Sequence, residues 1–96
     1  MIRRIVKLQI KASEIESFKN LFKENQHRIV AFEGCNHAEL WQDKNDNNIF
    51  FTYSLWNSEA DLNAYRHSKI FKGIWTETKK KFSGKPAAWS LDKMEF

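Results

Sequence analysis

Several features that commonly define a protein's class are scarce in this sequence. Cys35 is the only cysteine, so no disulfide can form within the chain and no cysteine pair is available to hold zinc. There is one proline and there are three glycines, and no stretch approaches the roughly 18 apolar residues of a membrane span. The beginning of the chain also lacks the apolar segment of a signal peptide. These absences favour a cytoplasmic protein that does not cross a membrane.

Charge of one sign is not concentrated either. The formal net charge is +4, but the only basic run, Lys79 to Lys81, lies where a helix is expected to end. Cations there oppose the partial negative charge of the helix C-terminus, so the run is more typical of a solvated helix end than of a phosphate-binding patch. The histidines lack metal-ligand spacing and the carboxylates do not cluster. We expect no metal and no nucleic-acid partner.

Aromatic side chains, by contrast, are abundant. They make up 15% of the 96 residues, and 42% of all residues are hydrophobic. A chain of this length suits a single domain, here residues 1–96, that buries roughly two-thirds of its unfolded surface. Such a domain has more large, flat side chains than a two-layer core needs. Some of them should therefore line a pocket or an interface.

Hydrophobic periodicity and turn residues predict the element order βαββαβ. The expected ranges are a strand at 2–10, a helix from 13 to about 27, strands at 35–42 and 48–56, a helix from 58 to 82 and a strand at 87–96. Ser13 and Glu16 read as a capping box, while Ser58 and Ser68 read as two caps that interrupt the second helix. This split βαβ order predicts an α+β, ferredoxin-like fold, with a four-stranded antiparallel sheet and two helices on one face.

Both faces of the predicted sheet carry apolar residues. Alternation assigns to the helix side Val6, Leu8, Ala38, Leu40, Ile49, Phe51, Tyr53, Leu55, Trp89 and Leu91. It assigns to the opposite side Ile5, Trp41, Phe50, Trp56 and Met94, among Lys7, His37, Glu39, Thr52 and Asp92. Exposing two tryptophans and a phenylalanine together forgoes about 1.5–3 kcal/mol of burial for each. A second copy of the chain is the simplest cover, which predicts a homodimer through the sheet face.

Single-stranded RNA is the competing cover, because RNA-recognition folds share this topology and stack bases on strand aromatics. Their third strand carries glycine and a leading basic residue. The segment 48–53, Asn-Ile-Phe-Phe-Thr-Tyr, has neither. The homodimer is therefore preferred.

Two segments resemble the antibiotic biosynthesis monooxygenase family. They are Glu33-Gly34-Cys35 and the segment 56–71, Trp-Asn-Ser-Glu-Ala-Asp-Leu-Asn-Ala-Tyr-Arg-His-Ser-Lys-Ile-Phe. The resemblance implies a dimeric α+β barrel in which two sheets face each other. The family includes enzymes that oxidise quinols and polyketide phenols with molecular oxygen and no metal or flavin, a branch that degrades haem, and members without an established activity.

The sequence departs from the family at informative positions. Many quinol-oxidising members have histidine where Tyr65 and Ile70 stand, and an acidic residue where Ser54 stands. The haem-degrading branch would need asparagine at Lys7, tryptophan at Tyr65 and histidine at Trp75. Without that histidine the iron lacks its axial ligand, so we expect no haem and no other cofactor.

Cofactor-free oxygenation requires a bound aromatic ring, exclusion of water, and a base or hydrogen-bond donor. An apolar box for a small aromatic molecule is predicted from Phe22, Phe51, Tyr53, Tyr65, Phe71 and Trp75. Tyr65 and His67 are the candidate catalytic residues, and Arg66 is a candidate for holding an anionic substrate. Each is also explained by a structural role: packing in the core, or solvation at the surface.

Two functions follow from these residues. The first is a cofactor-independent monooxygenase acting on a small phenolic or quinol-type molecule. The second is a non-catalytic, ligand-binding or regulatory dimer on the same scaffold.

Overall fold

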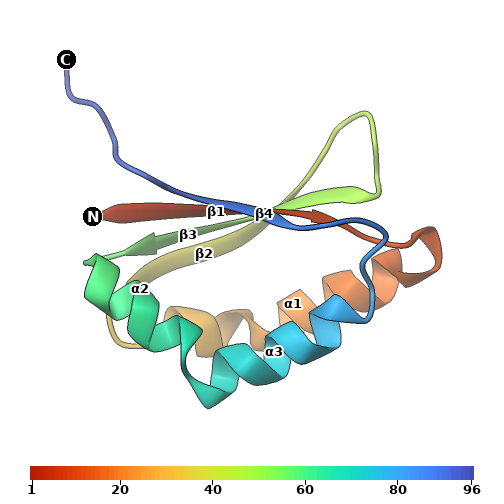
Figure 1. Cartoon of the computed structure of the whole chain (residues 1–96), viewed down its shortest axis with the longest axis horizontal. Coiled ribbons are helices and arrows are strands. Elements are labelled where there is room, and N and C mark those ends of the chain that lie inside the picture. Colours follow the sequence, from red (N-terminus) through yellow and green to blue (C-terminus); the bar gives the residue numbers. More distant parts are fainter.

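The computed structural model describes residues 1–96 as a four-stranded sheet with a helical layer on one side. In chain order the elements are β1 (Ile2–Gln9), the short 3-10 helix η1 (Ala12–Glu14), α1 (Ile15–Val30), β2 (Cys35–Gln42), β3 (Ile49–Trp56), α2 (Glu59–Arg66), α3 (Lys69–Lys79) and β4 (Ala87–Leu91). The strand order is β2-β3-β1-β4, and every neighbouring pair is antiparallel. The helices lie on the same side of the sheet (Figure 1). The predicted ferredoxin-like fold is confirmed.

Several predicted boundaries were wrong. The first helix continues to Val30, beyond the predicted end near residue 27, and α3 ends at Lys79 and not at residue 82. The last strand ends at Leu91, and the segment that follows extends away from the helical layer (Figure 1). The first helix has no capping box at Ser13, because η1 occupies that position and Glu14 takes the N-cap place without a side-chain cap bond. Instead, the Ser17 hydroxyl donates to the Glu14 carboxylate at 2.7 Å. A serine followed by a glutamate at capping-box spacing is therefore not sufficient to mark where α1 begins.

The predicted interruption of the second helix is confirmed, and it separates α2 from α3. The Ser58 hydroxyl accepts a hydrogen bond from the Asp61 backbone N–H at 3.2 Å, and Ser68 accepts one from the Phe71 N–H at 3.1 Å. Ser68 also donates to the Tyr65 carbonyl at 2.6 Å. Each serine thus satisfies a donor that a helix start leaves free. The second cap also fixes the turn between Tyr65 and Phe71.

Gly34 is required by the close approach of α2 to the start of β2. Its φ of +87° lies in the left-handed region, and a Cβ added there would collide with the Asp61 side chain. Its carbonyl accepts from the Asn57 N–H at 2.8 Å. Any other residue would therefore meet both backbone strain and a steric clash.

The prediction of two apolar faces holds, but the assignment of β3 and β4 to those faces was wrong. The register pairs Leu8 with Phe50 and Ile2 with Trp56, so these residues share the helix side, and Phe50 and Trp56 are completely buried. Residues 49, 51, 53 and 55 therefore lie on the outer face, which is the face of the sheet away from the helices. Residues 89 and 91 join them, because they pair with Ile5 and Arg3.

The cause of this error lies in the composition of β3. Phe50 and Phe51 are neighbours of equal hydrophobicity, so the strand does not alternate between apolar and polar residues and its pattern cannot identify the inner face. Only the pairing with β1 decides between the two. There the charged residues Lys7 and Arg3 mark the outer side.

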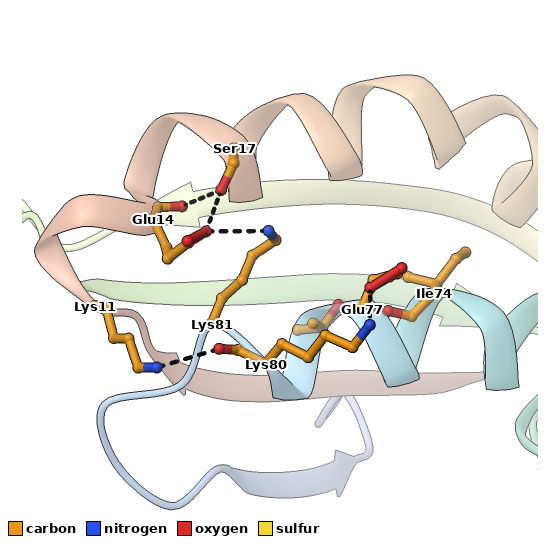
Figure 2. Close-up of polar contacts among 8 residues, drawn as sticks. Lys11, Glu14, Ser17, Ile74, Glu77, Lys80 and Lys81 are labelled. Atoms are coloured by element: carbon orange, nitrogen blue, oxygen red, sulfur yellow. Dashed lines mark hydrogen bonds and ion pairs between the residues drawn. The ribbon is translucent and has the colours of Figure 1, made fainter.

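The end of α3 is tied to the beginning of α1 by polar contacts (Figure 2). The Lys81 ammonium lies 3.2 Å from the Glu14 carboxylate, and the Lys11 ammonium donates to the Lys80 carbonyl at 3.4 Å. The Lys81 side chain is only 18% exposed, so this pair is better shielded from solvent than the nearby pair of Lys80 and Glu77. The prediction of a solvated helix end therefore holds for Lys80, whereas Lys81 is shielded and pairs with the start of α1.

Candidate functional site

A cavity of about 340 Å³ lies between the helical layer and the sheet. Its walls come from all three α-helices, from the helix side of β1 and β3, and from Ala87 and Ala88 of β4. It is lined by residues of both buried clusters of the core, the one around Trp56, Leu62 and Tyr65 and the one around Leu8, Phe18 and Phe50. The volume falls within the range of about 300–1,000 Å³ typical of small-molecule sites.

Aromatic rings in contact with one another form one side of this cavity. The Tyr65 ring centroid lies 5.3 Å from that of Phe71, and Phe71 is stacked on Trp75 at 5.7 Å. Behind Tyr65, the Trp56 ring lies 4.9 Å away. The spacing of Phe71 and Trp75 on one turn of α3 places both rings on the same side of the helix. The resulting wall is flat, apolar and suited to contact with an aromatic ring.

Tyr65 supplies a polar group on this wall. Its side chain is 8% exposed, and burial, with a smaller contribution from nearby Cys35, raises the pKa of its hydroxyl far above the ordinary value. The hydroxyl has no hydrogen-bond partner within the protein. Its oxygen is not among the fully buried polar atoms, so it remains accessible to a ligand. At neutral pH it is therefore a protonated group, free to donate to a ligand oxygen.

The only charged residues on the cavity lining are Arg4 of β1 and Arg66 at the end of α2. Arg4 is partly buried on the helix side of the sheet, where its guanidinium donates to the Ser90 hydroxyl at 3.1 Å. Burial, and after it the charge of Arg66, lower the pKa of Arg4. No carboxylate, imidazole or thiol lines the cavity. One part of a mostly apolar cavity therefore carries positive charge without an acidic partner.

Five of the residues predicted to form the site meet at this cavity. They are Phe22, Tyr65, Arg66, Phe71 and Trp75. They come from three helices, and they converge because α1 packs against α3 and because the chain bends at Ser68, between α2 and α3 (Figure 1).

The other three predicted residues do not direct their side chains into the cavity. Phe51 is on the outer face, and the Tyr53 ring is stacked on Trp41 there, with centroids 5.0 Å apart. Tyr53 still borders the cavity, but alternation along β3 directs Thr52 and Ser54 inward, so Tyr53 contributes its backbone. His67 is exposed, and its Nδ1 lies 2.7 Å from the Asn63 carbonyl oxygen. Its imidazole does not line the cavity.

Arg4 is the residue that the sequence interpretation missed. The signal was present, since Arg4 interrupts the alternation Ile2, Val6, Leu8 on the helix side of β1. A charged residue at an apolar position of a strand is uncommon unless it is paired or functional.

Other reactive side chains show no comparable arrangement. Cys35 is partly buried, its thiol lies 3.5 Å from the His37 carbonyl oxygen, and burial raises its pKa, which disfavours the reactive thiolate. Histidine, cysteine and carboxylate side chains nowhere form a group of three that could hold a metal ion. None of the helices has the length and apolar character needed to span a membrane.

The antiparallel sheet, the helices on one face and the aromatic cavity between the layers define a class of small α+β proteins. The family model of the antibiotic biosynthesis monooxygenases matches residues 1–75, and the chain belongs to this family. No curated protein sequence matches it significantly.

Solved structures share the whole fold. A crystal structure of an antibiotic biosynthesis monooxygenase superposes with a TM-score of 0.91 at 18% identity, covering 99% of this chain and 100% of that one. A conserved protein of Methanosarcina mazei Go1 gives a TM-score of 0.91 at 24% identity, with 97% and 92% of the two chains covered. At such low identity these similarities establish the fold and do not identify a substrate.

Proposed function

We propose that the protein is a cofactor-independent monooxygenase that oxidises a small phenolic or quinol-type molecule in the cavity. The observation that carries this proposal is that the wall formed by Tyr65, Phe71 and Trp75 lines the same cavity as two arginines. Membership of the monooxygenase family supports the same conclusion.

The chemistry requires an electron-rich ring. A phenol first loses its proton, and the phenolate gives one electron to oxygen, which yields a phenoxyl radical and superoxide. Their recombination forms a hydroperoxide at a ring carbon that carries hydrogen. Loss of water from it leaves a quinone, so phenol and oxygen are converted to quinone and water. The protein has to bind the ring, exclude solvent and stabilise the anion.

The residues of the cavity suit these tasks unequally. Arg4 and Arg66 favour the phenolate over the phenol, because an adjacent positive charge lowers the pKa of an acid. Tyr65, whose pKa is raised, donates a hydrogen bond to a ring oxygen and does not remove a proton. Because no carboxylate or imidazole lines the cavity, the substrate releases its proton to bulk solvent as it binds. In this scheme His67 has no part, since its ring lies on the surface.

Oxygen consumption with a panel of hydroquinones and naphthols tests this proposal. We expect Tyr65→Phe to lower kcat by about 10- to 100-fold, the range for loss of one hydrogen bond to a charged group. His67→Ala is the matched control and should leave the rate close to wild type. The absence of turnover with every phenol in air would contradict the proposal.

One observation favours a second function, a non-catalytic ligand-binding dimer. No carboxylate or imidazole lines the cavity, so no side chain there can act as a strong general base. This reading predicts that aromatic ligands raise the melting temperature in air while mass spectrometry detects no product. Product formation would reject it.

We further propose that the outer face is covered by a second copy of the chain. Trp41, Trp89 and Leu91 are 43%, 46% and 47% exposed, although they lie on a sheet beside further apolar side chains. Met94 and Phe96, in the segment that extends beyond β4, are exposed as well (Figure 1). An apolar surface of this kind marks an interface, and two-fold homodimers are the most common assembly. We place this dimer in the cytoplasm.

A further inference from the structure

We propose that the cavity takes an aromatic carboxylic acid, with the carboxylate held by Arg4 and Arg66 and the ring against the wall of Tyr65, Phe71 and Trp75. This inference rests on the proposed function only in using the same cavity. It narrows the ligand from phenols in general to aromatic acids. It also applies whether or not the ligand is oxidised.

Arg4 carries most of the argument. It lies on the helix side of β1, where the residues before and after it on the same face, Ile2 and Val6, are both apolar. Its only protein hydrogen bond goes to the neutral Ser90 hydroxyl, and it has no acidic partner. On the other neighbouring strand, β3, the residue opposite Arg4 is Ser54, which is also neutral. A partly buried guanidinium with one hydrogen bond keeps most of its five donors free.

Arg66 adds a second charge to the same cavity. Its position at the end of α2 is favourable for a cation by itself, because helix C-termini are partially negative. That explanation does not account for its proximity to Arg4, since the charge of Arg66 makes the protonated form of Arg4 less favourable. Two cations that repel each other beside an apolar cavity are both stabilised by one bound anion.

The geometry of arginine favours a carboxylate as that anion. The planar guanidinium matches the two oxygens of a carboxylate or phosphate group, with two parallel hydrogen bonds. Apart from the hydroxyls of Thr52, Ser54 and Thr78, the rest of the lining is apolar and aromatic, which favours a ring over a sugar or a chain of polar groups. A volume of about 340 Å³ has room for one or two fused rings with a substituent.

A matched pair of ligands tests the charge directly. 2-Naphthoate and 2-naphthamide share ring and shape, but only the first is an anion. Binding is measured by calorimetry at pH 7 with the full chain, without any need for turnover. We expect naphthoate to bind about 10- to 100-fold more tightly than the amide, the range for charge-assisted hydrogen bonds.

Variants locate the effect at the two arginines. Arg4→Gln should remove most of the preference for naphthoate and leave the affinity for naphthamide nearly unchanged, and Arg66→Gln should remove a smaller part. Arg4→Lys keeps the charge without the planar fork and should retain part of the preference. Arg28→Gln is the control, because Arg28 is exposed on α1 and bonded to Asn25, so it changes net charge only.

Several results would overturn the inference. Equal affinity for the two ligands, or no binding of naphthoate, would remove the anion site. An equal loss in Arg28→Gln would assign the effect to net charge. Displacement of naphthoate by inorganic phosphate at similar concentration would show an anion site without selectivity for the ring. None of these binding results depends on whether hydroquinones are oxidised. Failure of the anion site can therefore be distinguished from failure of the proposed monooxygenase activity.

Discussion

The two faces of this sheet are built from the same strands and are about equally apolar, yet they are buried in different ways. On the helix side, Phe50 and Trp56 have no exposed surface, and the space that remains is a cavity. On the outer face, Trp41 and Trp89 stay nearly half exposed. Hydrophobicity alone therefore does not tell a core from an interface. The difference comes from which face receives the helices.

The adjacent residues Phe50 and Phe51 provide the largest expected contrast between the two faces. Phe50→Ala should lower the free energy of unfolding by about 3–5 kcal/mol, because it removes a fully buried ring. The centroid of this ring lies 5.0 Å from that of Phe18. The loss should be independent of protein concentration in urea denaturation. Phe51→Ala should cost less, and its cost should depend on concentration. Equal, concentration-independent losses would break the distinction.

Trp89→Glu tests the outer face by itself. A charge within an apolar interface should raise the dimer dissociation constant by at least about 30-fold, as expected for an aromatic interface residue worth 2 kcal/mol or more. The folded monomer should retain its circular dichroism spectrum and its ligand binding. Ser90→Glu, on the helix side of the same strand, is the positional control and should weaken naphthoate binding while leaving association intact.

Tyr65 gives the helix side a characteristic dependence on alkaline pH. Its pKa is raised in the folded chain, while in the unfolded chain it is close to the ordinary value of 10.0. Below that value both states are protonated; above it the unfolded state alone loses the proton, so stability falls as pH rises. The slope attributable to this group approaches about 1.4 kcal/mol per pH unit once the pH exceeds the pKa of the unfolded chain. Urea denaturation between pH 9 and 11 should show a smaller decline in Tyr65→Phe, and identical slopes would contradict the assigned burial.

Ser68→Ala should have the smallest effect on stability, about 1 kcal/mol, the usual cost of losing a helix N-cap. Because this serine also fixes the turn between Tyr65 and Phe71, ligand affinity should fall as well. Ser58→Ala removes an equivalent cap from α2 and should cost similar stability with less effect on binding. The melting temperatures of the two variants report the loss of the helix cap, and their ligand affinities report the change in the shape of the cavity.

The sequence was sufficient to predict the element order, both internal helix caps and five residues of the cavity. Each rested on a strong local signal, such as the spacing of Phe71 and Trp75 on α3. It was not sufficient for β3, where Phe50 and Phe51 are interchangeable by composition and only pairing with β1 selects the inner one. For the same reason Phe51 and Tyr53 were expected in the cavity and lie on the outer face. His67 was a candidate because it lies at the predicted helix break, but it follows Tyr65 by two positions, and two helical steps turn a side chain by about 200°.

Sedimentation velocity of the unmodified chain at micromolar concentration tests the central claim that the two faces have different partners. If the outer faces of two copies pack together, the protein sediments as a species of twice the 11.5 kDa mass of the chain. A homogeneous particle of 11.5 kDa, with Trp41 and Trp89 left in water, would contradict it.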